Sequence, residues 1–284
     1  MIIITGGNGQ LGQALQQHAP SWAEVNAIDV EDCDLADIPM LRARLVVEAP
    51  DVIINTAACR ADDPAETDMG YLRAVNADAV AAMVEAVDQT GGKLVQISTN
   101  LVFDGSSSRP YRPYDVRVPI CAFGQSKTES EDHLRKQDLL IRTGLIYSTG
   151  HHNFVRSMIT LMNEREEIDV PAGTIGALTS ASGLARTVWS LIAQGANGIY
   201  HHCDEGVASW EQIAAAIAED AHALGLIRRI PAIRMRPDHE PPALALPRVQ
   251  PPLDCHATRA LLGEEPIHWR EALRQMLHEE AGLR

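Results

Sequence analysis

The sequence lacks paired cysteines. Its cysteines number five among 284 residues, and no two of them are separated by only two residues. They are Cys33, Cys59, Cys121, Cys203 and Cys255. An odd number of scattered thiols builds neither a disulfide framework nor a zinc site, and it is typical of a reducing compartment. We therefore expect a cytoplasmic protein without a metal site.

Long apolar runs and an excess of positive charge are also missing. No apolar run approaches the roughly 20 residues that a membrane-spanning helix needs, and Met1 leads into Ile2-Ile3-Ile4 without the basic segment of a secretion signal. Acidic residues outnumber basic ones by 38 to 24, for a formal net charge of −14. This balance argues against nucleic acid or an anionic membrane as partner. A small molecule is expected instead, anionic ones included, because a few arginines can dominate a pocket.

Short apolar runs alternate with helical patterns in the first half of the chain. The runs cover residues 2–4, 25–28, 51–55, 93–97 and 139–142. Continuous apolar strands separated by helices are typical of a parallel sheet covered on both faces. With right-handed crossovers, the pattern predicts an α/β fold with a doubly wound Rossmann sheet.

The second half of the chain is less regular. Residues 209–223 predict an amphipathic helix, residues 198–202 a late strand, and the proline-rich residues 228–252 mostly loop. We expect a dinucleotide-binding Rossmann domain over 1–147 and a smaller, mainly substrate-binding region over 148–284. Part of that region, about 176–203, is expected to return to the sheet.

Three glycines follow the first strand and open a helix. Gly6, Gly9 and Gly12 have the spacing that gives a tight turn, close backbone approach to a pyrophosphate and close helix–strand packing. Gln10 and Leu11 lie inside this turn, where the helix N-terminus would receive the pyrophosphate. The segment predicts an NAD or NADP site at these five residues.

Further cofactor contacts are expected at the ends of the next strands. Asp29 ends the second strand, where a carboxylate can bind a ribose hydroxyl and repel a 2′-phosphate, so that NAD is mildly favoured over NADP. A solvated loop carboxylate is the alternative for Asp29. The segment after it and the small residues after the third strand are expected to line the cofactor, or else to be turn residues. They are Asp34, Leu35, Thr56, Ala57 and Ala58.

Five motifs occur in a fixed order: TGGNGQLG, PDVIINTAACRADDPAE, ISTNLVFDG, FGQSK and LIRTGLIY. With them the chain resembles the dTDP-4-dehydrorhamnose reductases, which are extended short-chain dehydrogenases/reductases, over essentially its full length. Residues 153–155, 198–201 and 252–255 resemble the C-terminal half of the same family. The resemblance implies NAD(P)-dependent reduction of a keto group on a nucleotide-linked deoxysugar. Dimers are common among such folds.

The family's chemistry uses a hydroxyl, a tyrosine and a lysine. Thr99 matches the hydroxyl position, with Ser98 beside it, and Lys127 matches the lysine that holds the ribose and lowers the pKa of the tyrosine. Phe123 stands where the family has its tyrosine. Phenylalanine has no proton to donate, and the loss of a positioned general acid typically costs about 10²- to 10⁴-fold in rate.

Other positions of the resembled pocket also differ. Leu101 replaces a tyrosine in the family's Ser-Thr-Asp-Tyr run, and Leu145 replaces a tryptophan in its Arg-Thr-Ser-Trp run. A substitute proton donor is therefore sought in nearby loops, or in water relayed past Thr99. The candidates are Tyr111, Tyr114, Cys121, Tyr147, His151 and His152, with loop and packing roles as the alternative.

Substrate contacts are expected from four residues. They are Asn100, Arg142, Asn153 and Arg248. The guanidinium groups of the two arginines match phosphate and carboxylate anions, although surface ion pairing is the alternative for both.

Three functions remain open at this point. The first is an oxidoreductase with an atypical proton donor. The second is a catalytically silent dinucleotide-binding regulatory protein, which the loss of the tyrosine favours. The third is a non-redox epimerase or lyase on the same fold.

Overall fold

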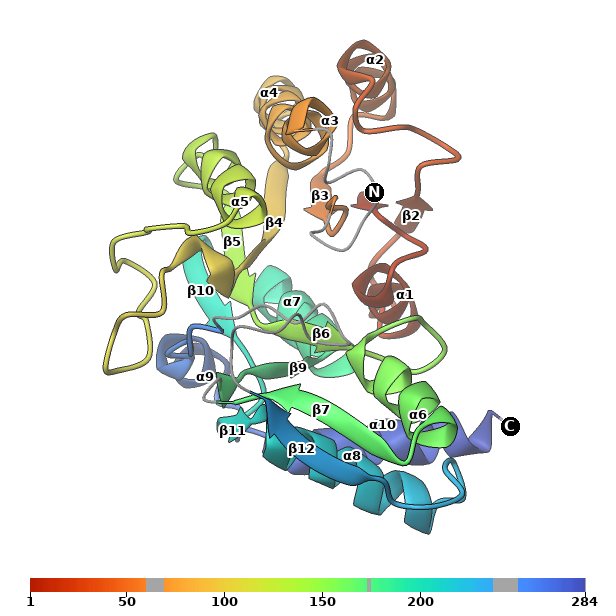
Figure 1. Cartoon of the computed structure of the whole chain (residues 1–284). Helices are drawn as coiled ribbons and strands as arrows, with labels where there is room; N and C mark the ends of the chain where they lie inside the picture. Colours follow the sequence, from red (N-terminus) through yellow and green to blue (C-terminus); the bar gives the residue numbers. More distant parts are fainter. Residues whose placement is uncertain (60–68, 173–174, 237–249, 284) are drawn as a thin grey trace.

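A six-stranded parallel sheet forms the centre of the protein (Figure 1). The computed structural model describes residues 1–59, 69–172, 175–236 and 250–283. The sheet strands are β1 (Ile2–Thr5), β2 (Val25–Ile28), β3 (Val52–Asn55), β4 (Lys93–Thr99), β5 (Leu139–Thr143) and β10 (Gly198–His202). Their order is β10-β5-β4-β3-β1-β2. Because β2 and β3 lie on opposite sides of β1, the winding reverses there, and doubly wound sheets bind ligands at the carboxyl ends of such strands.

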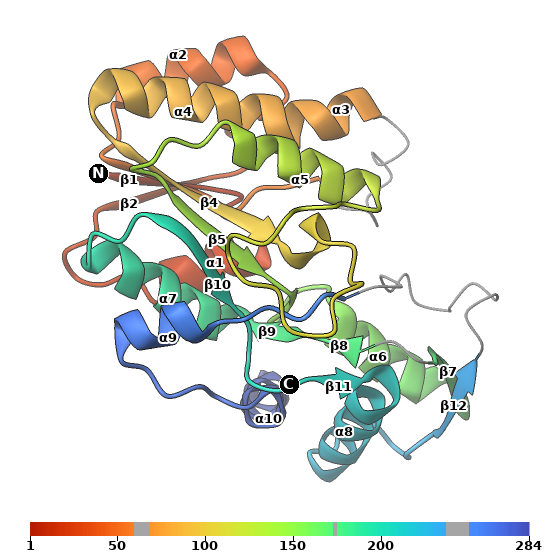
Figure 2. The ribbon, with the colours of Figure 1, turned by 90° about the vertical axis from the view of Figure 1, so that its left-hand side faces the viewer.

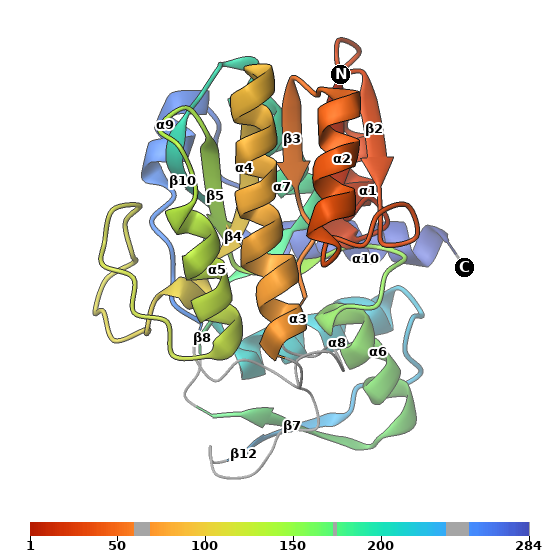
Figure 3. The same cartoon turned by 90° about the horizontal axis from the view of Figure 1, so that it is seen from above.

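Both faces of the sheet are buried, because successive strand residues point to opposite sides. The helices of the two layers are α1 (Gln10–Gln17) and α7 (Ala181–Ala193) on one face, and α2 (Ile38–Glu48), α3 (Met69–Arg73), α4 (Ala79–Thr90) and α5 (Ala122–Asp132) on the other (Figures 2 and 3). Ile2 and Ile4 pack beneath α1 and α7, whereas Ile3 packs beneath α2 and α4. This arrangement confirms the predicted α/β Rossmann fold.

Smaller elements lie beyond the carboxyl ends of the sheet strands (Figure 1). They are β6 (Leu145–Tyr147), α6 (Phe154–Glu164), β7 (Glu167–Pro171), β8 (Ile175–Gly176), β9 (Leu178–Ser180), β11 (Ala208–Ser209), α8 (Trp210–Ala223), β12 (Ala232–Arg236) and α10 (Trp269–Gly282). Trp210 is fully buried in their core and lies 4.9 Å from the ring of Phe154. These elements have a hydrophobic core of their own, separate from the two core clusters that flank the sheet. The helix α9 (His256–Leu262) instead packs against β10 and α7, beside the sheet (Figure 2).

The chain leaves this lobe after β9 and returns to the sheet, and it packs beside the sheet again at α9. β9 pairs with β6, α7 packs against α1, and β10 forms the edge strand beside β5. The sequence predicted such a return for about 176–203, while the domain boundary at residue 147 stays a prediction.

The proline-rich stretch, which the sequence predicts to be mostly loop, contains one strand among its described residues. Its residues 232–236 form β12, which pairs in parallel with β7. The five residues between Pro231 and Pro237 contain no proline, so each keeps the backbone N–H that a strand ladder needs. Within the described part of the chain, no helix is both long and apolar enough to cross a membrane.

Candidate active site

The glycine turn lets neighbouring backbone segments approach each other closely. Gly6 has a φ of +69°, and a Cβ there would lie 2.9 Å from the backbone of Ala57. A Cβ on Gly12 would lie 2.1 Å from the Gly6 carbonyl oxygen, so only glycine lets α1 begin this close to β1. Gly9 is the N-cap residue of α1 and offers no side-chain cap, and the first turn holds no acidic residue. The N–H groups in the first turn of α1 are therefore available to an anion.

The turn is tethered to the end of β2. Gly7 N–H donates to the Ile28 carbonyl at 2.9 Å, and Asn8 N–H donates to Asp29 Oδ2 at 2.7 Å. Asp29 Oδ1 accepts the N–H of Val30 at 2.8 Å. The Asp29 carboxylate thus lies beside the glycine turn, as a ribose contact requires, and it also has a structural role that the sequence did not reveal.

The other expected cofactor residues surround the same edge of the sheet. Thr56 donates from Oγ1 to the Thr5 carbonyl at 2.7 Å, and Ala57 and Ala58 follow it half-buried. Asp34 accepts the N–H of Ala36, so it stabilises a turn. The side chains of Leu11 and Leu35 are in the core, 4% and 7% exposed, so each can offer a ligand mainly its backbone.

Thr99 and Lys127 come from two elements that pack together. Thr99 is the last residue of β4, and its Oγ1 accepts the N–H of Leu101 at 3.1 Å. Lys127 lies on α5, one turn after the half-buried Phe123. Gly124 permits this packing, because a Cβ there would lie 2.2 Å from the Leu101 carbonyl oxygen. No sequence pattern indicated this role of Gly124.

The Lys127 ammonium is enclosed. The residue is 3% exposed, and among the described residues no hydrogen bond or ion pair reaches its Nζ. Burial lowers the pKa of Lys127 to about 8, partly opposed by the Glu131 carboxylate one helical turn further on. Such a group gains from an uncharged hydroxyl partner such as a ribose.

Glu131 holds a buried network that includes Ser98 and Arg142, two of the expected site residues. Its carboxylate accepts from Ser98 Oγ at 2.6 Å and from Arg142 Nε and Nη2 at 2.9 and 2.7 Å. Arg142 also donates from Nη1 to the Pro113 carbonyl and lies 5.1 Å above the Phe103 ring. Ser98 is therefore not a free catalytic hydroxyl, and the guanidinium of Arg142, 2% exposed, is held inside the protein by Glu131, Pro113 and His201.

Asn100 and Asn153 also have structural partners where substrate contacts were expected. Asn100 Nδ2 donates to Gln250 Oε1 and to the Pro251 carbonyl, both at 3.0 Å, and so fastens the returning chain to the end of β4. Asn153 caps α6 through the N–H of Arg156 and donates to two carbonyls of the preceding loop. The amide N–H groups of both residues are thus bonded within the chain, and a substrate contact from either side chain stays a prediction. Arg248, the fourth expected substrate contact, lies outside the described residues.

Most of the candidate substitute proton donors form hydrogen bonds elsewhere in the protein or are exposed to solvent. Tyr111 donates to Asp104 at 2.6 Å and stacks on Phe103. Tyr147 donates to Asp204 at 2.9 Å, and burial raises the pKa of Tyr147 well above its ordinary value. Tyr114 is 81% exposed, and the thiol of Cys121 caps α5.

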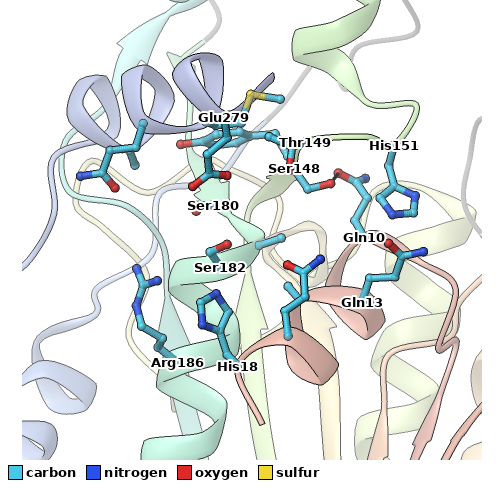
Figure 4. Close-up of a pocket in the computed structure, with 17 residues that line it drawn as sticks. Gln10, Gln13, His18, Ser148, Thr149, His151, Ser180, Ser182, Arg186 and Glu279 are labelled. Atoms are coloured by element: carbon cyan, nitrogen blue, oxygen red, sulfur yellow. Dashed lines mark hydrogen bonds between the residues drawn. The ribbon is translucent and has the colours of Figure 1, made fainter. Parts of the chain in front are cut away.

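A polar cavity lies on the other face of the sheet, between α1, α7 and α10 (Figure 4). His151 lines it, together with Gln10 and Ser148, whose hydroxyl donates to Gln10 Oε1 at 3.0 Å. His18 and Arg186 point into its other end (Figure 4). None of Thr99, Phe123 and Lys127 lines this cavity, so His151 belongs to a different region from the lysine. His152 is exposed on the same loop.

The fold and the site define an extended short-chain dehydrogenase/reductase. The family model described as "RmlD substrate binding domain" matches residues 1–281, and the chain belongs to this family. Among the described residues, no group of three or more His, Cys, Asp or Glu side chains could hold a metal ion.

Relatives match over almost the whole chain. The dTDP-4-dehydrorhamnose reductase of Aggregatibacter actinomycetemcomitans is 30% identical over 286 residues, 97% of both chains. The spore coat polysaccharide biosynthesis protein SpsK of Bacillus subtilis is 32% identical over 286 residues, which cover 99% of this chain and 98% of its own. The crystal structure of dTDP-4-dehydrorhamnose reductase from Bacillus anthracis in complex with NADP is 29% identical, covers 98% of both chains and has a TM-score of 0.88.

Proposed function

We propose that this chain is an NAD(P)-dependent reductase of a keto group on a nucleotide-linked deoxysugar or a related metabolite. The observation that carries the proposal is the placement of Thr99 and the buried Lys127 at the strand edge that also holds the uncapped N-terminus of α1. Full-length relatives named dTDP-4-dehydrorhamnose reductase support it.

The residues of the edge fit a dinucleotide. The first-turn N–H groups of α1 would hold the pyrophosphate, since Gly6 and Gly12 leave the space that a Cβ would fill. Asp29 would bind a ribose hydroxyl at the end of β2, and Lys127 would bind the other ribose. When bound in its reduced form, the nicotinamide supplies a hydride.

Thr99 is the residue for orienting the substrate carbonyl. Its hydroxyl accepts from Leu101 N–H and donates to Asn100 Oδ1 at 3.4 Å, a long hydrogen bond that a substrate carbonyl at the end of β4 would replace. A carbonyl oxygen placed there would be polarised by this hydroxyl. The lobe beyond the strand ends would then cover the sugar nucleotide.

A silent dinucleotide-binding protein is the second candidate function. Phe123 favours it, because this residue occupies the position that the resemblance assigns to the tyrosine and has no proton to give. The cofactor turn and Lys127 fit both functions, so binding alone does not distinguish them.

A homodimer in the cytoplasm is proposed with either function. Four side chains in alternate positions before α5 support the dimer, because they expose a row of apolar surface. They are Tyr114, Val116, Val118 and Ile120, with exposed fractions of 81%, 81%, 47% and 58%. Light scattering of the wild type and of Val116→Asp tests the dimer, and a monomeric wild type would exclude it. The five free thiols support a reducing compartment.

The test of the enzyme measures binding and turnover separately. Titration of purified protein with NADH and NADPH, followed by nicotinamide fluorescence, should show saturable binding, and its absence overturns both candidate functions. Reduction of dTDP-4-keto-6-deoxysugars is then assayed with the wild type and with Phe123→Tyr. Turnover by the wild type is the expected result. Turnover by Phe123→Tyr alone would favour the silent binding protein.

A further inference from the structure

The region around Phe123 has few acids that could replace a tyrosine. Tyr111 and Tyr147 donate their hydroxyl protons to carboxylates, and Tyr114 points into solvent. His151 lines the cavity on the face of the sheet opposite to α5 (Figure 4). A reductase that lacks the tyrosine would need a proton from a group that is already beside the carbonyl.

Lys127 is the candidate that α5 offers for this role. It lies four residues after Phe123, so both side chains occupy one face of α5. Gly124, between them, brings this turn of the helix against the end of β4 and its following turn. The residue is 3% exposed, and within the described part of the chain no hydrogen bond or ion pair reaches its ammonium.

We propose that the Lys127 ammonium donates the proton to the substrate carbonyl oxygen in this chain, in addition to holding the ribose. This proposal rests on the reductase function proposed above. In the reaction the carbonyl carbon accepts a hydride from the reduced nicotinamide, and the π electron pair of the carbonyl takes a proton from Nζ. A C–H and an O–H bond form, one N–H bond breaks, and Lys127 is left as a neutral amine that regains a proton from water.

The surroundings of Lys127 keep its proton transferable near neutral pH. Desolvation lowers the pKa to about 8, whereas the Glu131 carboxylate raises it. The charge of Glu131 is itself neutralised by Arg142 and Arg117. Glu131 therefore raises the pKa of Lys127 less than an unpaired carboxylate would.

The other elements packed against α5 bring few charges to this side. Asn76, in the helical turn between α3 and α4, exchanges hydrogen bonds with the backbone of Cys59 and donates to Ser126 Oγ on α5, so it brings no charge. On α3, Arg73 pairs with Glu129 and Asp78 at the exposed surface.

The pH dependence of turnover is the first part of the test. The kcat of the wild type should fall about tenfold per pH unit above pH 8, because only the ammonium form donates. Lys127→Arg keeps the positive charge but holds its protons too tightly. It should lower kcat by about 10²- to 10⁴-fold and abolish the fall near pH 8. Lys136→Arg, at an exposed position, is the control and should change neither.

A second measurement needs neither cofactor nor turnover. The chain holds three lysines, Lys93, Lys127 and Lys136. Their ε-carbon NMR signals can be assigned by the single Lys→Arg variants. The Lys127 signal should titrate with a midpoint near pH 8. A Lys127 signal that stays in its charged form up to about pH 10, the ordinary lysine range, overturns the proposal without any assay.

The outcomes separate this proposal from the proposed function. Turnover by the wild type whose kcat falls above pH 8, together with the loss of this fall in Lys127→Arg, supports both proposals. Turnover whose pH profile is unchanged in Lys127→Arg keeps the reductase and overturns Lys127 as the donor. Turnover by Phe123→Tyr alone also overturns Lys127 as the donor, since the reductase scaffold then works only with a phenol. No turnover by either protein on any substrate overturns the reductase function itself.

Discussion

Arg142 and Glu131 form a bidentate ion pair with Nε–Oε1 and Nη2–Oε2 distances of 2.9 and 2.7 Å, and each side chain is 2% exposed. The pair joins β5 to α5 directly beneath the helical turn that carries Lys127. A buried pair of this kind is costly to break, because removal of one partner leaves the other charge without compensation.

We predict that Glu131→Gln destabilises the protein by about 3–5 kcal/mol, since Arg142 keeps its charge inside the core. Urea unfolding measures the change. The double variant Glu131→Gln with Arg142→Met should lose less than the sum of the two single variants. The exposed pair Arg42–Glu85 is the matched control, and Arg42→Met should cost below about 1 kcal/mol. Additive effects at Glu131 and Arg142 would contradict the coupling.

Gly12→Ala should damage both stability and cofactor binding. Its Cβ would lie 2.1 Å from the Gly6 carbonyl oxygen, so the glycine turn must move away from α1. Overpacking of this kind typically costs about 1–3 kcal/mol, and it displaces the N–H groups that would hold the pyrophosphate. Thermal unfolding and NADH titration measure the two effects. Gly282→Ala meets no atom within 4 Å and serves as the control; equal NADH affinity in both variants would contradict the predicted site.

Asp29→Asn should shift the cofactor preference toward NADPH. The carboxylate beside the glycine turn repels a 2′-phosphate, whereas an amide keeps the contact with Asn8 N–H and lacks the charge. Two charges about 4 Å apart in water interact by about 1 kcal/mol, which corresponds to roughly a fivefold change in the ratio of the two dissociation constants. Parallel titrations with NADH and NADPH measure that ratio. An unchanged ratio would mean that Asp29 only holds the glycine turn.

The sequence predicted the parts of the molecule that local patterns determine. The apolar runs became the strands of the sheet because a buried parallel strand needs an unbroken apolar run. The glycine turn was predictable because Gly6 and Gly12 occupy positions that the backbone geometry reserves for glycine. Family membership followed from motifs spread along the whole chain and is confirmed by the matching family model.

The substrate contacts were not predictable in the same way. Ser98 and Thr99 are adjacent on β4, so their side chains point to opposite faces, and the sequence does not tell which face is buried. Arg142 donates to Glu131, which lies on a different element 11 residues away along the chain. Asn100 donates to Gln250, which is 150 residues away. In each case a long-range contact used the donor that the sequence pattern had assigned to a ligand.

Asn100→Asp tests that long-range contact. The resemblance places an aspartate at this position, but here the amide donates to two acceptors, Gln250 Oε1 and the Pro251 carbonyl. A carboxylate would face both acceptors without a proton, so we expect a loss of about 1–3 kcal/mol. Urea unfolding measures it at pH 7, with Asn197→Asp at an exposed position as the control. Full stability of Asn100→Asp would show that the returning chain is held by other contacts.

Asp204 should make the stability of the protein depend on pH in a predictable way. It accepts from Tyr147 and from Ser180 N–H, yet burial raises its pKa from 3.8 to about 6. Between about pH 4 and 6 the folded protein therefore keeps a proton that the unfolded chain has lost, so this group's contribution to stability falls as the pH rises through that window. At about 1.4 kcal/mol per pKa unit, the difference is up to about 3 kcal/mol. Urea unfolding from pH 4 to 7 should show a smaller decline for Asp204→Asn than for the wild type or for Glu31→Gln, an exposed control. Identical profiles for all three proteins would mean that the carboxyl titrates at its ordinary pKa.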